Sequence, residues 1–313
     1  MKLLVTGGAG FIGSHLVERL LARGDKIVVL DNLNDYYDPR IKRENLNGFI
    51  KSAGVVFVEG DILDAPLLDR ISNEHKFDVI VHLAARAGVR ASLEQPLLYE
   101  QVNCGGTLNM LEMARKHGVK RFVFASSSSV YGDVSVPFRE DAEMRPLSPY
   151  GATKAACELF CRNYHHLYGI SCNALRFFTV YGARQRPDMA IHKFVALIDK
   201  GQPVPFYGDG TTRRDYTYYT DIIDGVVGAI DRDLGFEVFN LGESRTTDLS
   251  RLVSLLETNL GKKAVLKRLP VQPGDMIDTF ADISKAKRLL DYKPSVPVEE
   301  GIKQFVVWYK ARS

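Results

Sequence analysis

Short apolar runs alternate with amphipathic helical patterns through the first part of the chain. The apolar runs read as unbroken Val, Ile, Leu and Phe stretches, which is typical of parallel strands that are buried on both faces. The pattern therefore predicts an α/β fold, a Rossmann-type doubly wound parallel sheet with helices on both faces. The predicted strands lie at 2–6, 27–30, 55–58, 78–83, 121–125 and 172–178, and the helices near 11–22, 40–52, 64–73, 94–117 and 148–169.

The alternation loosens after about residue 178, where prolines and glycines become frequent. We therefore expect a cofactor-binding domain over residues 1–180 and a smaller α/β substrate-binding lobe over residues 181–313, with some chain crossing between them. The lobe is expected at the carboxyl ends of the main strands, where open α/β folds bind ligands. Its predicted strands lie near 204–207, 237–240 and 264–267, and its helices near 188–200, 219–231, 247–260 and 298–311.

Composition bounds the class of protein without identifying it. With 45% hydrophobic and 25% charged residues, the chain has the make-up of a folded globule rather than a disordered segment. A net charge of +3 argues against a nucleic-acid-binding protein but leaves room for a small anionic ligand held by local arginines. No apolar run approaches the ~18 residues of a membrane span, so we expect no membrane partner and a cytoplasmic location. No metal site is expected, because metal-ligand spacing is absent around Cys104, Cys157, Cys161 and Cys172.

Residues 6–13, T-G-G-A-G-F-I-G, join the first predicted strand to the first predicted helix. The glycines permit a tight turn and a close backbone approach to a pyrophosphate, and the helix amino terminus offers free N–H groups to that anion. Asp31 closes the second strand, where an acid hydrogen-bonds the adenosine ribose and repels a 2′-phosphate. A glycine turn followed by a surface aspartate is the alternative. The strand before the loop and the helix after it favour a cofactor site, so we predict NAD.

Tyr150 and Lys154 open a predicted helix and stand on one face of it at i, i+4 spacing. A tyrosine hydroxyl, with an ordinary pKa near ~10, is a poor base at neutral pH, but a neighbouring ammonium favours the phenolate. A phenolate can take a hydroxyl proton while a hydride leaves the same carbon. The serines at 126–129, at the end of a predicted strand, can hydrogen-bond the reacting oxygen. The structural alternatives are that Tyr150 and Lys154 are ordinary surface residues of a helix and that the four serines form a polar loop.

The motifs T-G-G-A-G-F-I-G, H-L-A-A (82–85), S-S-S-S-V-Y-G (126–132) and Y-G-A-T-K (150–154) occur together here. In combination they resemble the extended short-chain dehydrogenase/reductases that act on nucleotide sugars. The resemblance continues through R-R-D-Y-T-Y (213–218) and P-G-D-M (273–276), so that it covers nearly the whole chain. Four stretches, at 31–38, 87–90, 176–182 and 186–190, make the chain similar to the UDP-glucuronate 4-epimerases in particular.

The resemblance implies residue roles. It implies Ser127, Tyr150 and Lys154 as the catalytic residues. A departure from the family pattern is Gln272, where many relatives carry an arginine that contacts the diphosphate. For NAD it implies Gly7, Gly10, Phe11, Ile12, Gly13, Asp31, Asn32, Asp61, Ile62, Leu83, Ala84, Ala85, Asn103, Tyr150 and Lys154, and for the UDP-sugar Arg90, Ser127, Ser128, Ser129, Thr179, Arg186, Arg214 and Asp275. Arg86, which stands where this subfamily is expected to carry glutamine, is a further candidate for the UDP-sugar.

Members of this superfamily begin by oxidising a sugar carbon and differ in the later chemical steps. Dehydratases and decarboxylating relatives carry acidic residues just after the strand-end hydroxyl residue, whereas this chain has Ser128 and Ser129. The absence of these acids favours plain C4 epimerisation. Thr179 stands where UDP-glucose 4-epimerases usually carry asparagine. Arg186, if it is not a solvated loop residue, can supply a cation for a sugar carboxylate.

We therefore expect reversible NAD-dependent epimerisation of UDP-glucuronate to UDP-galacturonate through a 4-keto sugar. Three enzymatic alternatives remain open: a UDP-glucose 4-epimerase, a UDP-N-acetylglucosamine 4-epimerase and, less favoured, a UDP-glucuronate decarboxylase. An NAD-sensing scaffold of the same fold would be a different class, but it has no need of a base such as Tyr150. By resemblance we also expect a homodimer that pairs the helices near 94–117 and 148–169. Arg86 is expected either to add charge near the site or to form a surface salt bridge.

Overall fold

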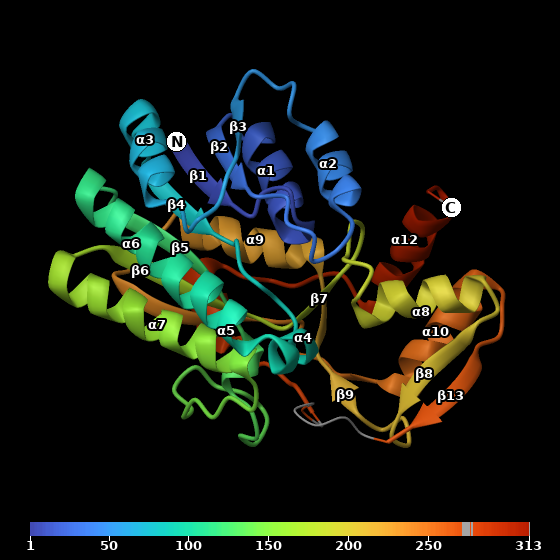
Figure 1. The fold of residues 1–313 in the computed structure, drawn as a ribbon. Helices are drawn as coiled ribbons and strands as arrows, with labels where there is room; N and C mark the ends of the chain where they lie inside the picture. The colour runs from blue at the N-terminus through green and yellow to red at the C-terminus, as the bar shows by residue number, and fades with distance from the viewer. Residues whose placement is uncertain (271–275, 277, 313) are drawn as a thin grey trace.

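The computed structural model describes residues 1–270, 276 and 278–312, and its centre is one parallel β-sheet (Figure 1). The seven strands lie in the order β11-β6-β5-β4-β1-β2-β3, and all six neighbouring pairs are parallel. This is the order of a dinucleotide-binding fold with one additional edge strand, which confirms the predicted class. The strands are β1 Lys2–Thr6, β2 Lys26–Asp31, β3 Val55–Glu59, β4 Val79–His82, β5 Arg121–Ser127, β6 Ser171–Phe177 and β11 Phe236–Leu241.

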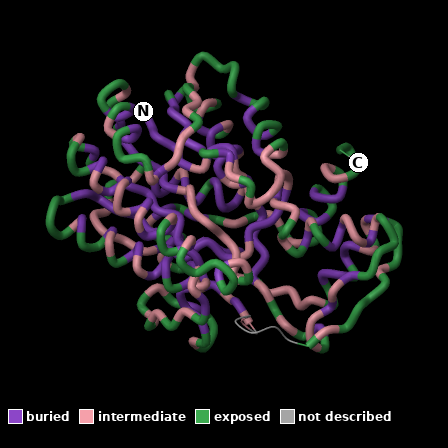
Figure 2. Tube along the Cα trace, viewed as in Figure 1, coloured by how far each residue is buried: buried purple, intermediate pink, exposed green. Residues whose placement is uncertain are grey.

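Helices cover both faces of this sheet. Neighbouring residues of a strand point to opposite faces, and both faces are apolar, so both must be covered. Leu3 and Val5 of β1 pack into one apolar cluster, whereas Leu4 packs into the other. All three side chains are fully buried, and the tube view shows the buried segments running through the middle of the molecule (Figure 2). The first face carries α1 Phe11–Ala22, α9 Tyr219–Ile230 and α11 Ser284–Leu290, and the second α3 Ala65–His75, α6 Gly106–His117 and α7 Pro149–Tyr168.

The prediction of a single long helix near 94–117 is wrong for the first part of that range. The chain forms α4 Val89–Glu94, breaks at Gln95, and resumes as α5 Pro96–Tyr99, a π-helical turn and then α6. The break precedes Pro96, because the residue before a proline is disfavoured in the helical conformation. The π-helical turn holds Asn103, whose side chain is bonded to other segments rather than facing solvent.

The smaller lobe packs around its own apolar cluster, which contains Phe194, Phe206, Leu256 and Phe305. The division at residue 180 stays a prediction, and the chain crosses it, because β11 and α9 belong to the main sheet and its cover. The lobe comprises α8 Ala190–Asp199, β8 Pro203–Tyr207, α10 Leu249–Leu260, β13 Val265–Leu269 and α12 Val298–Lys310. The remaining elements are α2 Pro39–Asn47, β7 Thr179–Tyr181, β9 Arg213–Arg214, β10 Tyr216–Tyr218 and β12 Thr247–Asp248.

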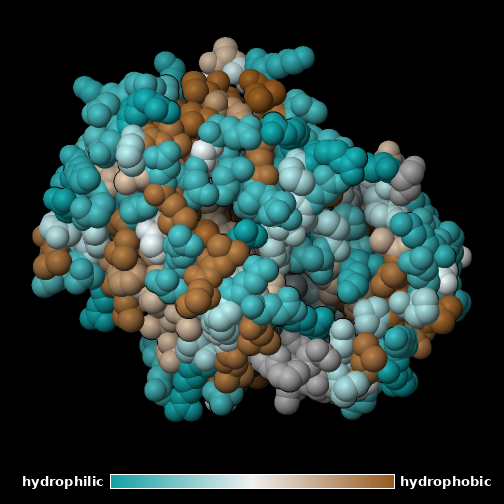
Figure 3. Space-filling model, viewed as in Figure 1, coloured by the Kyte–Doolittle hydropathy of each residue, from teal (hydrophilic) through white to brown (hydrophobic). Residues whose placement is uncertain are grey.

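The surface is largely polar, but apolar side chains gather over α4 and α5 (Figure 3), where Leu93 is 47% exposed and Leu97 82%. Among the residues described, no helix combines the length and apolar character needed to cross a membrane. Within the same residues, no cluster of three or more His, Cys, Asp or Glu side chains could hold a metal ion. The four cysteines are free thiols and buried.

Candidate active site

One cavity opens at the carboxyl ends of the central strands, where the loops after β1, β2, β4, β5 and β6 meet. It encloses about 1340 Å³ of space, solvent-open volume included. The predicted residues that line it are Gly7, Gly10, Phe11, Ile12, Gly13, Asp31, Asn32, Asp61, Ile62, Leu83, Ala84, Ala85, Ser127, Tyr150, Lys154 and Arg186.

At two positions around the loop between β1 and α1, Gly7 and Gly13, the backbone leaves no room for a side chain. Gly7 has a φ of +70°, and a Cβ there would lie 2.8 Å from the amide nitrogen of Ala84. A Cβ on Gly13 would lie 2.2 Å from the carbonyl oxygen of Gly7. The first turn of α1 has no side-chain cap and no acidic residue, and its residues line the cavity. This arrangement offers N–H groups and the positive end of the helix dipole to an anion.

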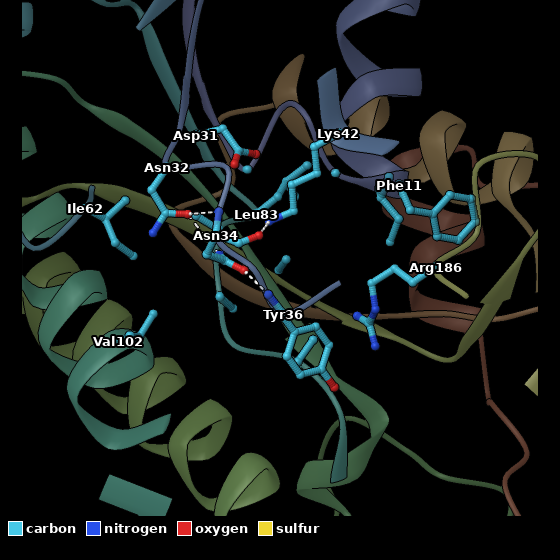
Figure 4. A pocket seen from close by; sticks show the side chains of 18 of the residues that line it. Phe11, Asp31, Asn32, Asn34, Tyr36, Lys42, Ile62, Leu83, Val102 and Arg186 are labelled. Atoms are coloured by element: carbon cyan, nitrogen blue, oxygen red, sulfur yellow. Dashed lines mark hydrogen bonds between the residues drawn. The ribbon is translucent and has the colours of Figure 1, made fainter. Parts of the chain in front are cut away.

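Asp31 ends β2 as a buried carboxylate beside the cavity (Figure 4). Its Oδ2 accepts a hydrogen bond from the amide of Ala9 at 3.0 Å and its Oδ1 one from the amide of Leu33 at 2.9 Å. Burial raises the pKa of Asp31, and the ammonium of Lys42 acts in the opposite direction. Each carboxylate oxygen keeps a lone pair, so Asp31 can still accept a bond from a ribose hydroxyl. Asn32 donates to Asp61 at 2.7 Å.

The catalytic candidates come from β5 and the start of α7. Ser148 caps α7 by accepting a bond from the amide of Gly151 at 3.1 Å, and Pro149 occupies the first turn, so Tyr150 is held at the helix entrance. Lys154 is 4% exposed, and its Nζ donates to the carbonyl of Ala125 at 2.7 Å. Nζ lies 6.0 Å from the centre of the Tyr150 ring. The two residues therefore face one cavity.

Ser127, at the end of β5, completes this group. Its hydroxyl lies 3.1 Å from the hydroxyl of Ser129 and accepts a bond of 3.1 Å from the Ser129 amide. The chain then turns through a short 3₁₀ helix at 128–130, which carries Ser128 away from the cavity wall. Of the four serines, Ser126 and Ser127 line the cavity.

A buried ion pair lies directly behind the catalytic strand end, and it was not among the sequence predictions. Glu158 of α7 and Arg176 of β6 are each 3% exposed and form two hydrogen bonds of 3.0 and 2.7 Å. The hydroxyl of Ser126 donates to the same carboxylate at 2.5 Å. Glu158 follows Lys154 by one helical turn, which is the pattern that could have indicated it. The pair joins α7, which carries Lys154, to β6, and the Ser126 bond extends the contact to β5, which ends at Ser127.

Arg186 reaches the cavity from the start of the lobe, with a partner already bound. Its Nε and Nη2 each lie 2.9 Å from a carboxylate oxygen of Asp188. Tyr36 lies next to it, with the guanidinium carbon 5.3 Å from the ring centre (Figure 4). Neither Tyr36 nor Asp188 was among the predicted site residues, although both lie in motifs that carried the resemblance. Other lining residues that the prediction missed are Asn34, Tyr37, Lys42, Val102, Phe178 and Met189.

Several predicted residues do not contribute to the cavity wall formed by the described part of the chain. Asn103 is 2% exposed and binds the backbone of Arg86 through both its amide oxygen, at 2.8 Å, and its amide nitrogen, at 3.0 Å. The guanidinium of Arg90 stacks on Tyr207, 4.6 Å from the ring centre. Asp275, and Gln272 with it, lies outside the described residues. The others that stand off the wall are Arg86, Ser128, Ser129, Thr179 and Arg214, whose substrate roles stay predictions.

The residues present fit a dinucleotide. An uncapped helix amino terminus faces the middle of the cavity, a buried acid lies beside it, and Asp61 and Ile62 border the same space. These features match the needs of a diphosphate, a ribose diol and an adenine ring, respectively. Phe11 and Ile12 would cover the diphosphate, while Tyr150 and Lys154 stand at the opposite, reactive end.

Fold and cavity together define a nucleotide-sugar-modifying enzyme of the extended short-chain dehydrogenase/reductase class. The chain belongs to the GDP-mannose 4,6-dehydratase family, whose sequence profile matches residues 4–305. Among curated proteins it is 45% identical over 309 residues to a UDP-glucuronate 4-epimerase from Thermodesulfobacterium geofontis, covering 98% of this chain and 95% of that protein. UDP-glucuronate 4-epimerase 3 from Arabidopsis thaliana is 43% identical, with 98% of this chain and 76% of the relative covered.

Solved structures agree with these relatives. The UDP-glucuronic acid 4-epimerase from Bacillus cereus, in complex with UDP-glucuronic acid and NAD, superposes with a TM-score of 0.95 over the full length of both chains at 38% identity. The UDP-glucose 4-epimerase from Thermotoga maritima, with UDP-glucose, gives a TM-score of 0.91 at 36% identity and covers 100% of this chain and 99% of that one.

Proposed function

We propose that this protein catalyses the reversible, NAD-dependent C4 epimerisation of UDP-glucuronate to UDP-galacturonate. The observation that carries the proposal is that Ser127, Tyr150 and Lys154 line the same cavity as Asp31 and the glycine loop. No carboxylate follows Ser127 on the strand end, where elimination or decarboxylation chemistry would need one. Relatives of 45% and 43% identity that are named UDP-glucuronate 4-epimerases support the same assignment.

Tyr150 acts as the base in the proposed mechanism. It takes the proton of the sugar 4-hydroxyl, and the buried ammonium of Lys154 stabilises the phenolate that does so. Ser127 donates a hydrogen bond to the same oxygen. A bound NAD would supply the hydride acceptor for C4 and the hydride donor for the return to the other face of the sugar. The 4-keto sugar must turn over between the two transfers, after which Tyr150 returns its proton to the new 4-hydroxyl, so that no proton or electron is lost.

The sugar carboxylate is proposed to lie near Arg186, with Thr179, Ser128 and Ser129 as further hydrogen-bond donors. A guanidinium suits a carboxylate because its planar N–H groups match the two oxygens. Arg186 and Tyr150 line the same cavity, so the guanidinium is available to a sugar that Tyr150 contacts. Arg214 and Asp275 are proposed to hold the diphosphate and the uridine ribose, with Arg86 and Arg90 nearby.

A UDP-hexose 4-epimerase is the second candidate, favoured by the structural likeness to the UDP-glucose 4-epimerase from Thermotoga maritima. Incubation of the protein with UDP-glucuronate, UDP-glucose and UDP-N-acetylglucosamine in turn, followed by separation of the C4 epimers, distinguishes the candidates. We expect UDP-galacturonate as the main product. Faster turnover of UDP-glucose would replace the proposal by the second candidate, and a UDP-pentose would indicate decarboxylation.

The Tyr150→Phe variant tests the catalytic assignment. We expect a loss of about 10²–10⁴-fold in kcat, the usual contribution of a general base, with the amount of co-purified NAD unchanged. Tyr168→Phe, at the exposed carboxyl end of the same helix, is the matched control and should retain full activity. An active Tyr150→Phe protein would refute the mechanism.

We also propose a cytoplasmic homodimer. The exposed Leu93 and Leu97, together with Leu159 of α7, which is 54% exposed, form the apolar surface that supports a paired-helix contact. Light scattering on the eluted peak of a sizing column is expected to give twice the chain mass of 35.0 kDa. A peak at the monomer mass, at micromolar protein, would contradict it.

A further inference from the structure

The guanidinium of Arg186 is held before any sugar arrives. Its side chain is 18% exposed, and Asp188 binds it through two parallel hydrogen bonds, both of 2.9 Å. Burial works against the charge on Arg186, but the bonds to Asp188 outweigh it and raise the pKa of Arg186, which therefore stays charged. Burial also opposes ionisation of Asp188, and the bonds from Arg186 outweigh this too, so that the pKa of Asp188 lies below its usual range.

Tyr36 adds a second constraint on the same group. The ring centre of Tyr36 is 5.3 Å from the guanidinium carbon of Arg186 and 5.8 Å from that of Arg86. Its hydroxyl also lies near the carboxylate of Asp188 and further lowers the pKa of that acid. The backbone leaves room for this tyrosine, since Gly88 has a φ of +105° and a Cβ there would lie 2.6 Å from the Tyr36 hydroxyl.

The placement of the three groups separates a substrate contact from its support. Arg186 and Tyr36 line the cavity, whereas Asp188 does not contribute to the wall formed by the described residues. A free arginine side chain samples many rotamers, and a guanidinium that is fixed beforehand loses less conformational entropy when a ligand binds. Asp188 also brings a negative charge towards the site, which by itself would repel a sugar carboxylate. If Asp188 mainly supports Arg186, replacing Asp188 should weaken binding of a sugar carboxylate. If Asp188 mainly repels the carboxylate, the same replacement should strengthen that binding.

We propose that Asp188 and Tyr36 are positioning residues that fix the guanidinium of Arg186 at the reactive end of the cavity, and thereby set the preference for a UDP-sugar with a C5 carboxylate over one with a C5 hydroxymethyl group. This inference rests on the proposed function. Asp188 acts through two charge-assisted hydrogen bonds, and Tyr36 acts through its aromatic face and through the hydroxyl that lies near Asp188.

The test measures dissociation constants by titration calorimetry on the NAD-loaded protein, with UDP-glucuronate, UDP-glucose and UDP as ligands. A Tyr150→Phe background prevents turnover of the ligands during the titration. The variants are Asp188→Asn, Asp188→Glu and Tyr36→Phe. The matched control is Asp141→Asn, because Arg139 and Asp141 form the same two-bond pair at the same spacing, with side chains 63% and 73% exposed.

We expect both Asp188 variants to lower the preference for UDP-glucuronate over UDP-glucose by about tenfold, the effect of a hydrogen bond to a charged group. Tyr36→Phe is expected to lower it about threefold, while the affinity for UDP stays within about twofold in every variant. Asp141→Asn should change none of the three constants.

Three results would overturn the inference. A higher preference in Asp188→Asn with no change in Asp188→Glu would make Asp188 a repelling charge. An equal weakening of all three ligands would make the contact merely structural, and an unchanged preference in Tyr36→Phe would remove the Tyr36 hydroxyl from the proposal. If the unsubstituted background shows no preference for UDP-glucuronate, the proposed function fails and the inference fails with it. A preference that survives both Asp188 substitutions overturns the inference alone.

Discussion

Replacing Glu158 by leucine is expected to destabilise the protein severely, because it leaves a buried guanidinium without its counter-ion. Both side chains of the Glu158–Arg176 pair are 3% exposed, so water cannot take the place of the lost partner. The carbonyl of Glu140, at 3.3 Å from Arg176, and the ring of Tyr131 remain as weaker contacts. Breaking a buried pair on one side costs about 3–5 kcal/mol, and the orphaned hydroxyl of Ser126 adds about 1 kcal/mol. Against a typical total of ~5–15 kcal/mol, this is a large fraction.

The assay is urea unfolding followed by circular dichroism, for Glu158→Leu, Arg176→Met and the double variant. We expect the midpoint to fall sharply in each single variant and to recover in the double variant, since removing both charges avoids burying either one alone. Arg251→Met is the control, because it breaks an exposed pair with Glu299 and should cost less than about 1 kcal/mol. A single variant that loses as little as this control, or a double variant no more stable than the singles, would refute the reasoning.

Two further substitutions test the cofactor loop and a buried acid. Gly13→Ala would place a Cβ 2.2 Å from the carbonyl oxygen of Gly7, so the loop must distort, and NAD extracted from the purified protein should fall well below the parent; an unchanged NAD content would contradict this. Burial raises the pKa of Glu243 to about 7, and its Oε2 has no partner among the described residues. Because folding raises that pKa, the native state binds the extra proton between about pH 4.5 and 7, and stability falls as pH rises through that interval. Glu243→Gln should therefore be more stable than the parent at pH 8, by on the order of 3 kcal/mol, and show little difference at pH 4.5; equal midpoints at pH 8 would sink the idea.

The parts of the fold that depend on local pattern were predictable. Unbroken apolar runs identify β1 to β6 because both faces of a parallel sheet are buried, and the glycine loop identifies the first crossover because backbone and anion must meet there. The pairing of β11 with β6 was not predictable, since a short strand late in the chain, with Glu237 and Asn240 among its six residues, does not indicate which sheet it joins. The strand that the sequence assigned to the lobe at 237–240 is an edge of the main sheet.

The candidate site divides in the same way. Tyr150 and Lys154 share a helix face, and Ser127 ends a strand, so local spacing is enough to propose them. Arg176 and Glu158 meet only because α7 packs on β6, and Tyr36 reaches Arg186 only through the path of the loop after β2. Such contacts depend on tertiary packing, which no periodicity encodes.

The electrostatics of the cavity explain why the net charge of the chain says so little. Each of two cations on the wall has an acid beside it: Lys42 faces Asp31, and Arg186 binds Asp188. From outside, each pair is close to neutral, and beyond about one Debye length of ~8 Å it exerts little field. A ligand in contact with these pairs meets fixed hydrogen-bond donors and acceptors. Because these groups are partly shielded from water, their hydrogen bonds to the ligand are stronger than they would be in bulk solvent. Recognition of charged ligands, the cofactor as well as the sugar, can therefore rest on where four side chains are held, while the whole molecule carries a charge of only +3.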